Sequence, residues 1–234
     1  MNQATGDTPN HIGVLNEQPL HAALKARYAS PGSQLEAEVD GFVVDVARED
    51  LLIEIQTGSF SGIRDKITSL AAHHHLRLVY PIPRQKWLLK LPTQSGEKAR
   101  RRKSPKRGRV EELFKELVSF PQLICSETFS VEVVFTHEEE VRSHDPKRWR
   151  NRGWVTVERR LLEVVETQLF SSPEDLATLL PPGLPARFTT ADLADGMRGP
   201  RWLAQKMAYC LRHTTVIEQV GRKGRANLYV VANT

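Results

Sequence analysis

The segment from residue 39 to residue 56 constrains the fold most, because it sets acidic side chains among residues typical of buried strands. Residues 39–46 read Val-Asp-Gly-Phe-Val-Val-Asp-Val, and residues 51–56 read Leu-Leu-Ile-Glu-Ile-Gln after a short polar turn. Burying a carboxylate among such neighbours is costly unless a cation or a hydrogen-bond donor compensates. The segment therefore predicts an antiparallel β-hairpin whose acids bind a metal ion.

The register of this hairpin decides which aspartate shares a face with Glu54 and Gln56. Side chains alternate along a strand, so a turn with an odd number of residues selects Asp40, and an even number favours Asp45. We adopt Asp40 and keep Asp45 as the alternative. Solvent-facing acids on a half-exposed hairpin are the simpler interpretation, but little open face remains beside the apolar neighbours Phe42, Val44, Ile53 and Ile55.

The composition predicts a globular protein of the cytoplasm. The chain has 234 residues, of which 40% are hydrophobic and 26% charged, enough for one large domain or a core domain with a small appendage. The sequence has no apolar run of the length of a membrane span, and the polar residues 1–10 do not resemble a signal peptide. We therefore expect no membrane partner. Two distant cysteines, Cys125 and Cys210, argue against structural zinc.

Positive charge is concentrated between Glu97 and Arg109, where eight Lys and Arg residues face one Glu. A solvated loop is the simplest explanation, and RNA, acidic lipid or another protein could each bind such a run. No amphipathic apolar face lies beside it, which favours a phosphate backbone over a membrane. The predicted DNA contacts in this run are Arg100, Arg101, Arg102 and Lys103. A second charged run, Glu138 to Glu140, is expected to be solvated.

Hydrophobic periodicity predicts the elements. The first half has the order helix, two strands, helix, strand, over residues 16–29, 35–46, 51–56, 63–72 and 76–82. An amphipathic helix at 110–118 and strands at 129–136 and 154–165 follow, although 159–166 could instead be helical. Beyond Ser172 the pattern changes to three short helices and a hairpin with a basic tip, over residues 173–180, 190–197, 200–213, 216–220 and 228–231.

Residues 15–82 resemble the PD-(D/E)xK nuclease superfamily, whose core is a helix, a hairpin carrying metal-binding acids, a helix and a further strand. The resemblance implies an α/β, restriction-endonuclease-like core with a mixed sheet, and Mg²⁺ or Mn²⁺ bound by Asp40 and Glu54, with Glu17 assisting. The motif position that is usually Lys is Gln56 here, and Lys66 on the next helix could supply the missing charge. Two carboxylates can hold Mg²⁺ against a phosphate while a bound water attacks.

The last 60 or so residues, from Pro173 onward, resemble a winged helix-turn-helix domain. In that family the third helix enters the major groove and the hairpin, or wing, contacts the backbone or minor groove. Winged helices also bind proteins, but the basic tip favours DNA. The implied contacts are Arg198, Arg201, Gln205, Lys206 and Arg212 on the helix and Arg222, Lys223 and Arg225 on the wing.

These patterns together predict four regions: a nuclease core at 11–92, a basic linker at 93–109, an α+β middle region at 110–170 and a winged-helix domain at 171–234. The predicted function is Mg²⁺-dependent hydrolysis of phosphodiester bonds in DNA. Gln56 supports the alternative, a non-catalytic DNA-binding regulator on a decayed nuclease scaffold. The sequence leaves the oligomeric state open, a homodimer included.

Overall fold

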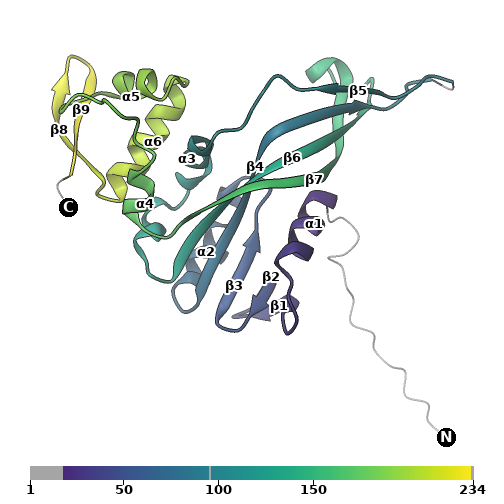
Figure 1. The fold of residues 1–234 in the computed structure, drawn as a ribbon, viewed down its shortest axis with the longest axis horizontal. Coiled ribbons are helices and arrows are strands. Elements are labelled where there is room, and N and C mark those ends of the chain that lie inside the picture. Colours follow the sequence, from purple (N-terminus) through teal and green to yellow (C-terminus); the bar gives the residue numbers. More distant parts are fainter. Residues whose placement is uncertain (1–17, 95, 233–234) are drawn as a thin grey trace, which may run out of the picture.

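A seven-stranded mixed β-sheet forms the body of the molecule (Figure 1). The structure is a computed structural model that describes residues 18–94 and 96–232. Six strands follow the order β1-β2-β3-β4-β6-β7, and β5 pairs with β4. A separate two-stranded sheet lies near the C-terminus. The predicted mixed α/β class and mixed sheet are confirmed.

The N-terminal part has one strand more than its sequence pattern predicts. Its elements are α1 (Pro19–Tyr28), β1 (Gln34–Val39), β2 (Phe42–Arg48), β3 (Leu51–Ile55), the 3₁₀ turn η2 (Phe60–Ile63), α2 (Arg64–Ala71) and β4 (His75–Lys90). The predicted strand 35–46 is divided by a turn at Asp40 and Gly41, which have φ of 50° and 78°. Gly41 tolerates this left-handed backbone because it lacks a Cβ. β1, β2 and β3 pair antiparallel, and β4 is parallel to β3.

Three long strands, β4, β6 and β7, complete the sheet. β4 pairs in parallel with β6 (Phe129–His144), which pairs antiparallel with β7 (Trp154–Phe170). The strand predicted at 76–82 is longer in the structure, because β4 continues past Pro83 through a register shift between Pro83 and Gln85. β5 (Arg100–Lys103) lies antiparallel on β4. Residues from the predicted core, linker and middle region therefore share one sheet.

Apolar side chains cover the two faces of the sheet separately. On one face, Leu20 and Leu24 of α1 pack with Ile53, Val79 and Val134. On the other face, α2 and α3 (Leu113–Leu117) bury the neighbouring positions of the same strands, including Leu78 and Val133. The 3₁₀ turns η3 (Val110–Glu112) and η4 (Pro121–Cys125) flank α3. The fold is thus helix, sheet, helix in layers.

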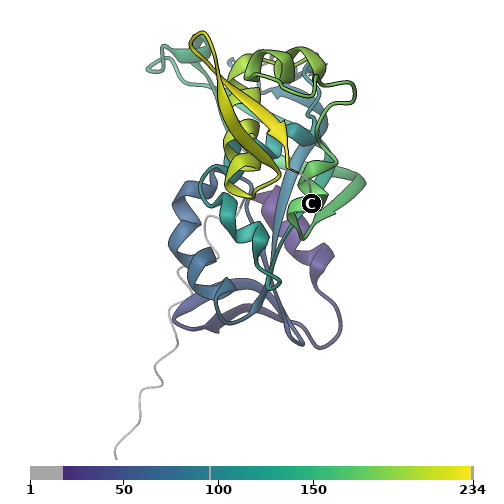
Figure 2. The same ribbon diagram turned by 90° about the vertical axis from the view of Figure 1, so that its left-hand side faces the viewer.

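The C-terminal unit lies at the end of the sheet opposite β5 (Figures 1 and 2). It contains α4 (Pro173–Ala177), α5 (Thr190–Gly196), α6 (Arg201–His213), β8 (Ile217–Lys223) and β9 (Ala226–Val231). Capping boxes begin α4 and α5, and Phe188 forms an isolated antiparallel bridge with Tyr229 of β9. The unit is joined to the sheet through a continuous apolar cluster that includes α3 and α6.

None of the helices within residues 18–94 and 96–232 is long and apolar enough to cross a membrane.

Candidate functional site

The turn between β2 and β3 brings Asp45 to Glu54. Arg48 pairs with Leu51, so the turn contains two residues, an even number, and selects Asp45 by strand alternation. Regular backbone pairing ends at Val46 and Ile53. Beyond this pair, the backbone N–H of Ile55 donates to Asp45 Oδ2 at 2.7 Å. The side chain of Asp45 thus replaces a backbone acceptor where the two strands separate.

Asp40 lies elsewhere, in the turn between β1 and β2. Its side chain is half exposed, and its Oδ2 is 2.8 Å from Nε2 of His74. The cause is the Asp40–Gly41 turn, which divides the strand in which this aspartate was expected. Asp45 therefore replaces Asp40 in the candidate site.

Glu54 is buried, and its carboxylate forms an ion pair with a lysine of the following helix. Lys66 Nζ of α2 donates to Glu54 Oε1 at 2.5 Å and to the Val43 carbonyl at 2.6 Å. The other carboxylate oxygen of Glu54, Oε2, is buried and has no hydrogen-bond partner among the described residues. The predicted proximity of Lys66 to the hairpin acids is present in the structure.

The environments of the two carboxylates separate their pKa values. Burial, and then the charge of Asp45, raise the pKa of Glu54 above its ordinary value, against the opposing effect of Lys66. Burial would also raise the pKa of Asp45. Hydrogen bonding and charge from His21, whose Nε2 lies 3.2 Å from Asp45 Oδ2, together with the Ile55 N–H, outweigh burial and lower that pKa. Such separation is typical of sites that use two acids differently.

Gln56, the third motif residue, does not contact this pair in any hydrogen bond of the described residues. Its side-chain amide donates to the Ser59 carbonyl at 2.7 Å, and its backbone N–H donates to the Val79 carbonyl at 2.9 Å. Gln56 thus fixes the turn after β3. Glu17, the predicted assisting acid, lies outside the described residues.

Asp45 and Glu54 fit a hydrated hard cation. No group of three or more His, Cys, Asp or Glu side chains within residues 18–94 and 96–232 is arranged to hold a metal. Mg²⁺ retains several waters and needs only one or two carboxylates, whereas structural zinc needs about four protein ligands. The unpartnered Glu54 Oε2 offers an oxygen that a cation could use.

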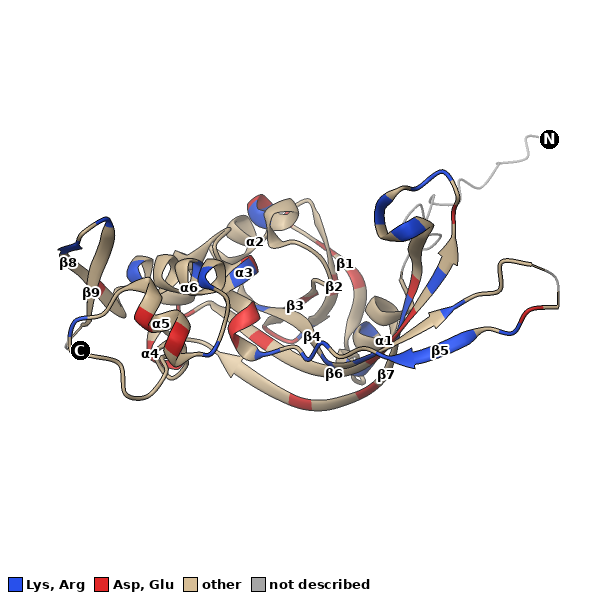
Figure 3. Ribbon diagram, turned by 90° about the horizontal axis from the view of Figure 1, so that it is seen from above, with Lys and Arg blue, Asp and Glu red and all other residues tan. Residues whose placement is uncertain are grey.

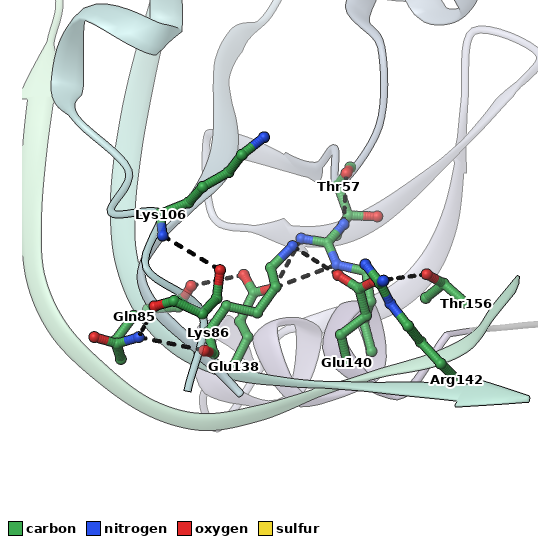
Figure 4. A network of polar contacts seen from close by, with 11 residues as sticks. Thr57, Gln85, Lys86, Lys106, Glu138, Glu140, Arg142 and Thr156 are labelled. Carbon is green, nitrogen blue, oxygen red and sulfur yellow. Dashed lines mark hydrogen bonds and ion pairs between the residues drawn. The ribbon is translucent and has the colours of Figure 1, made fainter. Parts of the chain in front are cut away.

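A second polar network, which the sequence did not predict, ties β6 and β7 to the end of β3 (Figure 4). Glu138, expected in a solvated run, is fully buried and accepts from the Arg159 guanidinium at 2.9 Å and from Thr136 Oγ1 at 2.7 Å. Arg159 also donates to the Thr57 carbonyl at 3.0 Å. The missed signal is the alternation of Thr136, Glu138 and Glu140 along one face of a strand.

The predicted DNA contacts on β5 form a basic stretch along the sheet margin (Figure 3). Arg100, Arg101, Arg102 and Lys103 are all exposed. Arg101 Nε donates to Glu139 at 2.7 Å, and its guanidinium lies 5.1 Å from the Trp87 ring centroid. Positive charge therefore lies on a strand of the sheet, where a basic linker was expected.

The predicted contacts on α6 separate into two sides of the helix. Arg201, Gln205, Tyr209 and Arg212 line a cavity of about 480 Å³ together with Arg225 of the wing. Lys206 instead donates its Nζ to the Lys115 carbonyl of α3 at 3.1 Å. The other wing residues, Arg222 and Lys223, are exposed. The sequence did not single out Tyr209, which lies between the basic positions on the exposed side.

Comparison with known proteins places this sheet in a family. Residues 18–171 match the family described as Domain of unknown function (DUF8091). The chain belongs to the DUF8091 family. The match begins one residue before α1 and ends just after β7, so the DUF8091 region contains the whole seven-stranded sheet and stops before α4.

A protein of Treponema pallidum (strain Nichols), named "Uncharacterized protein", is 30% identical to this chain over 220 residues. The aligned part covers 93% of this chain and 86% of that protein, so the similarity extends beyond the DUF8091 region into the C-terminal unit. The search of solved structures gave no match.

Proposed function

We propose that the protein is a Mg²⁺-dependent nuclease that hydrolyses phosphodiester bonds in DNA. The observation that carries the proposal is the meeting of Asp45, Glu54 and Lys66 at the separating ends of β2 and β3. Two acids and a lysine are the groups of a PD-(D/E)xK site, with the lysine moved from the strand to the next helix. The order helix, three antiparallel strands, helix and parallel strand supports a restriction-endonuclease-like core.

Each side chain has a distinct task in this proposal. Asp45, held ionised by His21 and the Ile55 N–H, and Glu54, through its free Oε2, would hold Mg²⁺ or Mn²⁺. The bound ion would supply a water molecule that is acidic enough to attack phosphorus. Lys66 places a positive charge beside Glu54, where it would stabilise negative charge that grows on the phosphoryl oxygens.

The C-terminal unit supports DNA as the substrate. Its order of helix, bridged segment, two helices and hairpin supports a winged helix-turn-helix domain. Arg201 and Arg212 of α6 and Arg225 of the wing line one cavity. A surface that binds a phosphate backbone needs such a group of neighbouring cations. DNA would contact this surface and the basic strand β5.

A second candidate is a DNA-binding regulator without catalysis. The contact of Gln56 with the Ser59 carbonyl favours it, because this side chain is then not directed at an attacking water. The ion pair between Lys66 and Glu54 would in that case only neutralise a buried acid.

Cleavage of supercoiled plasmid by the purified full-length protein tests the proposal. Nicked or linear product should form with Mg²⁺ and should be absent with EDTA and in Glu54→Gln. The regulator predicts that wild type and Glu54→Gln bind DNA equally and that neither produces cleavage with Mg²⁺ or Mn²⁺.

A further inference from the structure

A basic cavity separate from Asp45 and Glu54 lies beside β5. Its volume is about 480 Å³, and it is enclosed by β4, β5, β6 and residues 104–108. Its charged lining consists of five basic and two acidic side chains: Lys86, Arg102, Lys106, Arg107, Arg142, Glu112 and Glu140. An excess of cations around a hollow predicts an anionic ligand.

The segment 104–108 is fastened to β4, so one wall of the cavity is fixed. The Ser104 N–H donates to the Lys86 carbonyl at 2.8 Å, and the Gly108 N–H donates to the Pro83 carbonyl at 2.8 Å. The Gln85 side chain also donates to the Ser104 carbonyl at 3.0 Å. At Gly108 a Cβ would collide with the Ile82 side chain and lie 2.7 Å from the Pro83 carbonyl oxygen. Only glycine permits this close approach.

Glu140 fixes two of the cations in place (Figure 4). Its Oε2 lies 2.9 Å from Lys86 Nζ, and its Oε1 lies 2.6 Å from the Arg142 guanidinium. Thr156 donates a further hydrogen bond to Oε1 at 2.7 Å. The carboxylate is buried, with 8% of its side chain exposed. Glu140 therefore holds both basic side chains at the cavity before any ligand arrives.

Three other cations at the cavity are available to a ligand. Arg102, Lys106 and Arg107 are exposed, and none of them forms an ion pair with a carboxylate of residues 18–94 and 96–232. The backbone N–H of Lys106 donates to Ser104 Oγ (Figure 4). This hydrogen bond fixes the backbone from which the Lys106 side chain extends. Guanidinium and ammonium groups in this number suit the oxygens of a phosphate.

We propose that this cavity binds a phosphate group of a nucleic-acid strand whose neighbouring phosphates lie along β5. Arg102 belongs to both surfaces, so the basic stretch of β5 runs into the cavity without interruption. A single free phosphate would leave the exposed cations of β5 unused, whereas a strand would contact both. The inference rests on the proposed DNA partner but not on cleavage.

Fluorescence anisotropy with the full chain tests this site, using a labelled 20-base-pair duplex over a range of salt concentrations. In Lys106→Ala/Arg107→Ala the affinity should fall, and the slope of log K against log salt should decrease by about 1 to 2, since each lost phosphate contact contributes about 0.9. The matched control is Arg27→Ala/Arg48→Ala, which removes the same charge from α1 and β2 and should change the slope less.

Equal slopes for the two double variants would overturn the proposal. Pyrophosphate titrated by calorimetry separates a free phosphate compound from a strand. Loss of pyrophosphate binding with unchanged DNA binding in Lys106→Ala/Arg107→Ala would also overturn it. Glu54→Gln serves as the reference for the nuclease proposal: if cleavage is never observed but the slope still changes, the nuclease fails and the phosphate cavity stands.

Discussion

At the scale of single residues, the central feature is a buried acid that is only half compensated. One carboxylate oxygen of Glu54 accepts a hydrogen bond from Lys66. The other oxygen has no hydrogen-bond partner among the described residues. A buried polar atom without a partner costs roughly 1–3 kcal/mol. Such a cost is retained in proteins mainly where it serves a function, and binding of a cation at Oε2 would remove it.

The first prediction compares Lys66 with Gln56. Lys66→Ala should slow cleavage by about 100-fold, the scale expected when one charge-stabilising group is lost from a site. Gln56→Ala should slow it less, because the Gln56 amide is engaged with the Ser59 carbonyl. Single-turnover rates at saturating enzyme measure both. A larger loss of rate in Gln56→Ala than in Lys66→Ala would contradict this order and would indicate that Gln56 orients the attacking water.

The second prediction concerns stability at low pH. Burial opposes ionisation of Glu140, but hydrogen bonds from Thr156 and Lys86, the charge of Lys86 and a hydrogen bond from Arg142 outweigh it and lower the pKa to about 2. A lowered pKa contributes stability that is complete above the ordinary value and is lost as the pH falls toward 2. The free energy of unfolding should lose on the order of 2 kcal/mol through Glu140 between pH 6 and pH 3.

Urea unfolding of wild type and Glu140→Gln over this pH range measures the effect. Glu140→Gln should show a weaker pH dependence than wild type, while Glu166→Gln, which removes an exposed acid paired with Arg84, should follow wild type. Parallel curves for wild type and Glu140→Gln would contradict the lowered pKa.

The residues of the candidate site could be predicted only in part. The acids of the hairpin were identified from residue type and position, because buried carboxylates need partners, whereas Lys66 was identified only through the resemblance to the PD-(D/E)xK superfamily. The choice between Asp40 and Asp45 depended on the length of the turn between β2 and β3, which residues 47–50 alone do not determine. His21 was not identified, because its contact with Asp45 depends on how α1 packs across the sheet.

At the scale of elements, α6 should bind DNA with one side only. The third prediction is that Arg201→Ala/Arg212→Ala reduces duplex affinity and lowers the salt slope by about 2, as expected for two lost phosphate contacts. Lys206→Ala is the matched control on the same helix, and it should leave the slope unchanged because Lys206 contacts the Lys115 carbonyl. Anisotropy titrations against salt measure both variants. A loss in Lys206→Ala equal to that of the double variant would contradict this orientation of α6.

The helices and strands themselves were predicted unevenly. Apolar periodicity identified α5, α6 and the hairpin of β8 and β9, since each forms from neighbouring residues. It missed the division between β1 and β2 and the length of β4, β6 and β7. Those strands continue through prolines and charged residues because long-range pairing supplies their hydrogen bonds, which a local pattern does not contain.

At the scale of the whole molecule, the sheet and the C-terminal unit should unfold together. Arg109 donates to the Met197 carbonyl at 2.6 Å and to the Arg198 carbonyl at 3.2 Å, and the apolar cluster is continuous between the two parts. The fourth prediction is therefore one calorimetric transition, with equal calorimetric and van't Hoff enthalpies.

Leu211→Ala should lower the free energy of unfolding by about 2–5 kcal/mol and shift the single transition to lower temperature, because Leu211 is fully buried in the shared cluster. Val231→Ala, at an exposed position of β9, is the control and should have little effect. Two separate transitions, with only one moved by Leu211→Ala, would contradict cooperative unfolding.

If Asp45 and Glu54 form a metal-dependent hydrolytic site, as we propose, Asp45 and Asp40 should differ sharply in their effect on cleavage. Plasmid cleavage in Mg²⁺ would be measured for wild type, Asp45→Asn and Asp40→Asn, which remove the same charge from β2 and from the turn that precedes it. We predict that Asp45→Asn abolishes cleavage while keeping DNA binding, and that Asp40→Asn cleaves at nearly the wild-type rate. Cleavage by Asp45→Asn at the wild-type rate, or loss of cleavage in Asp40→Asn alone, would contradict the account.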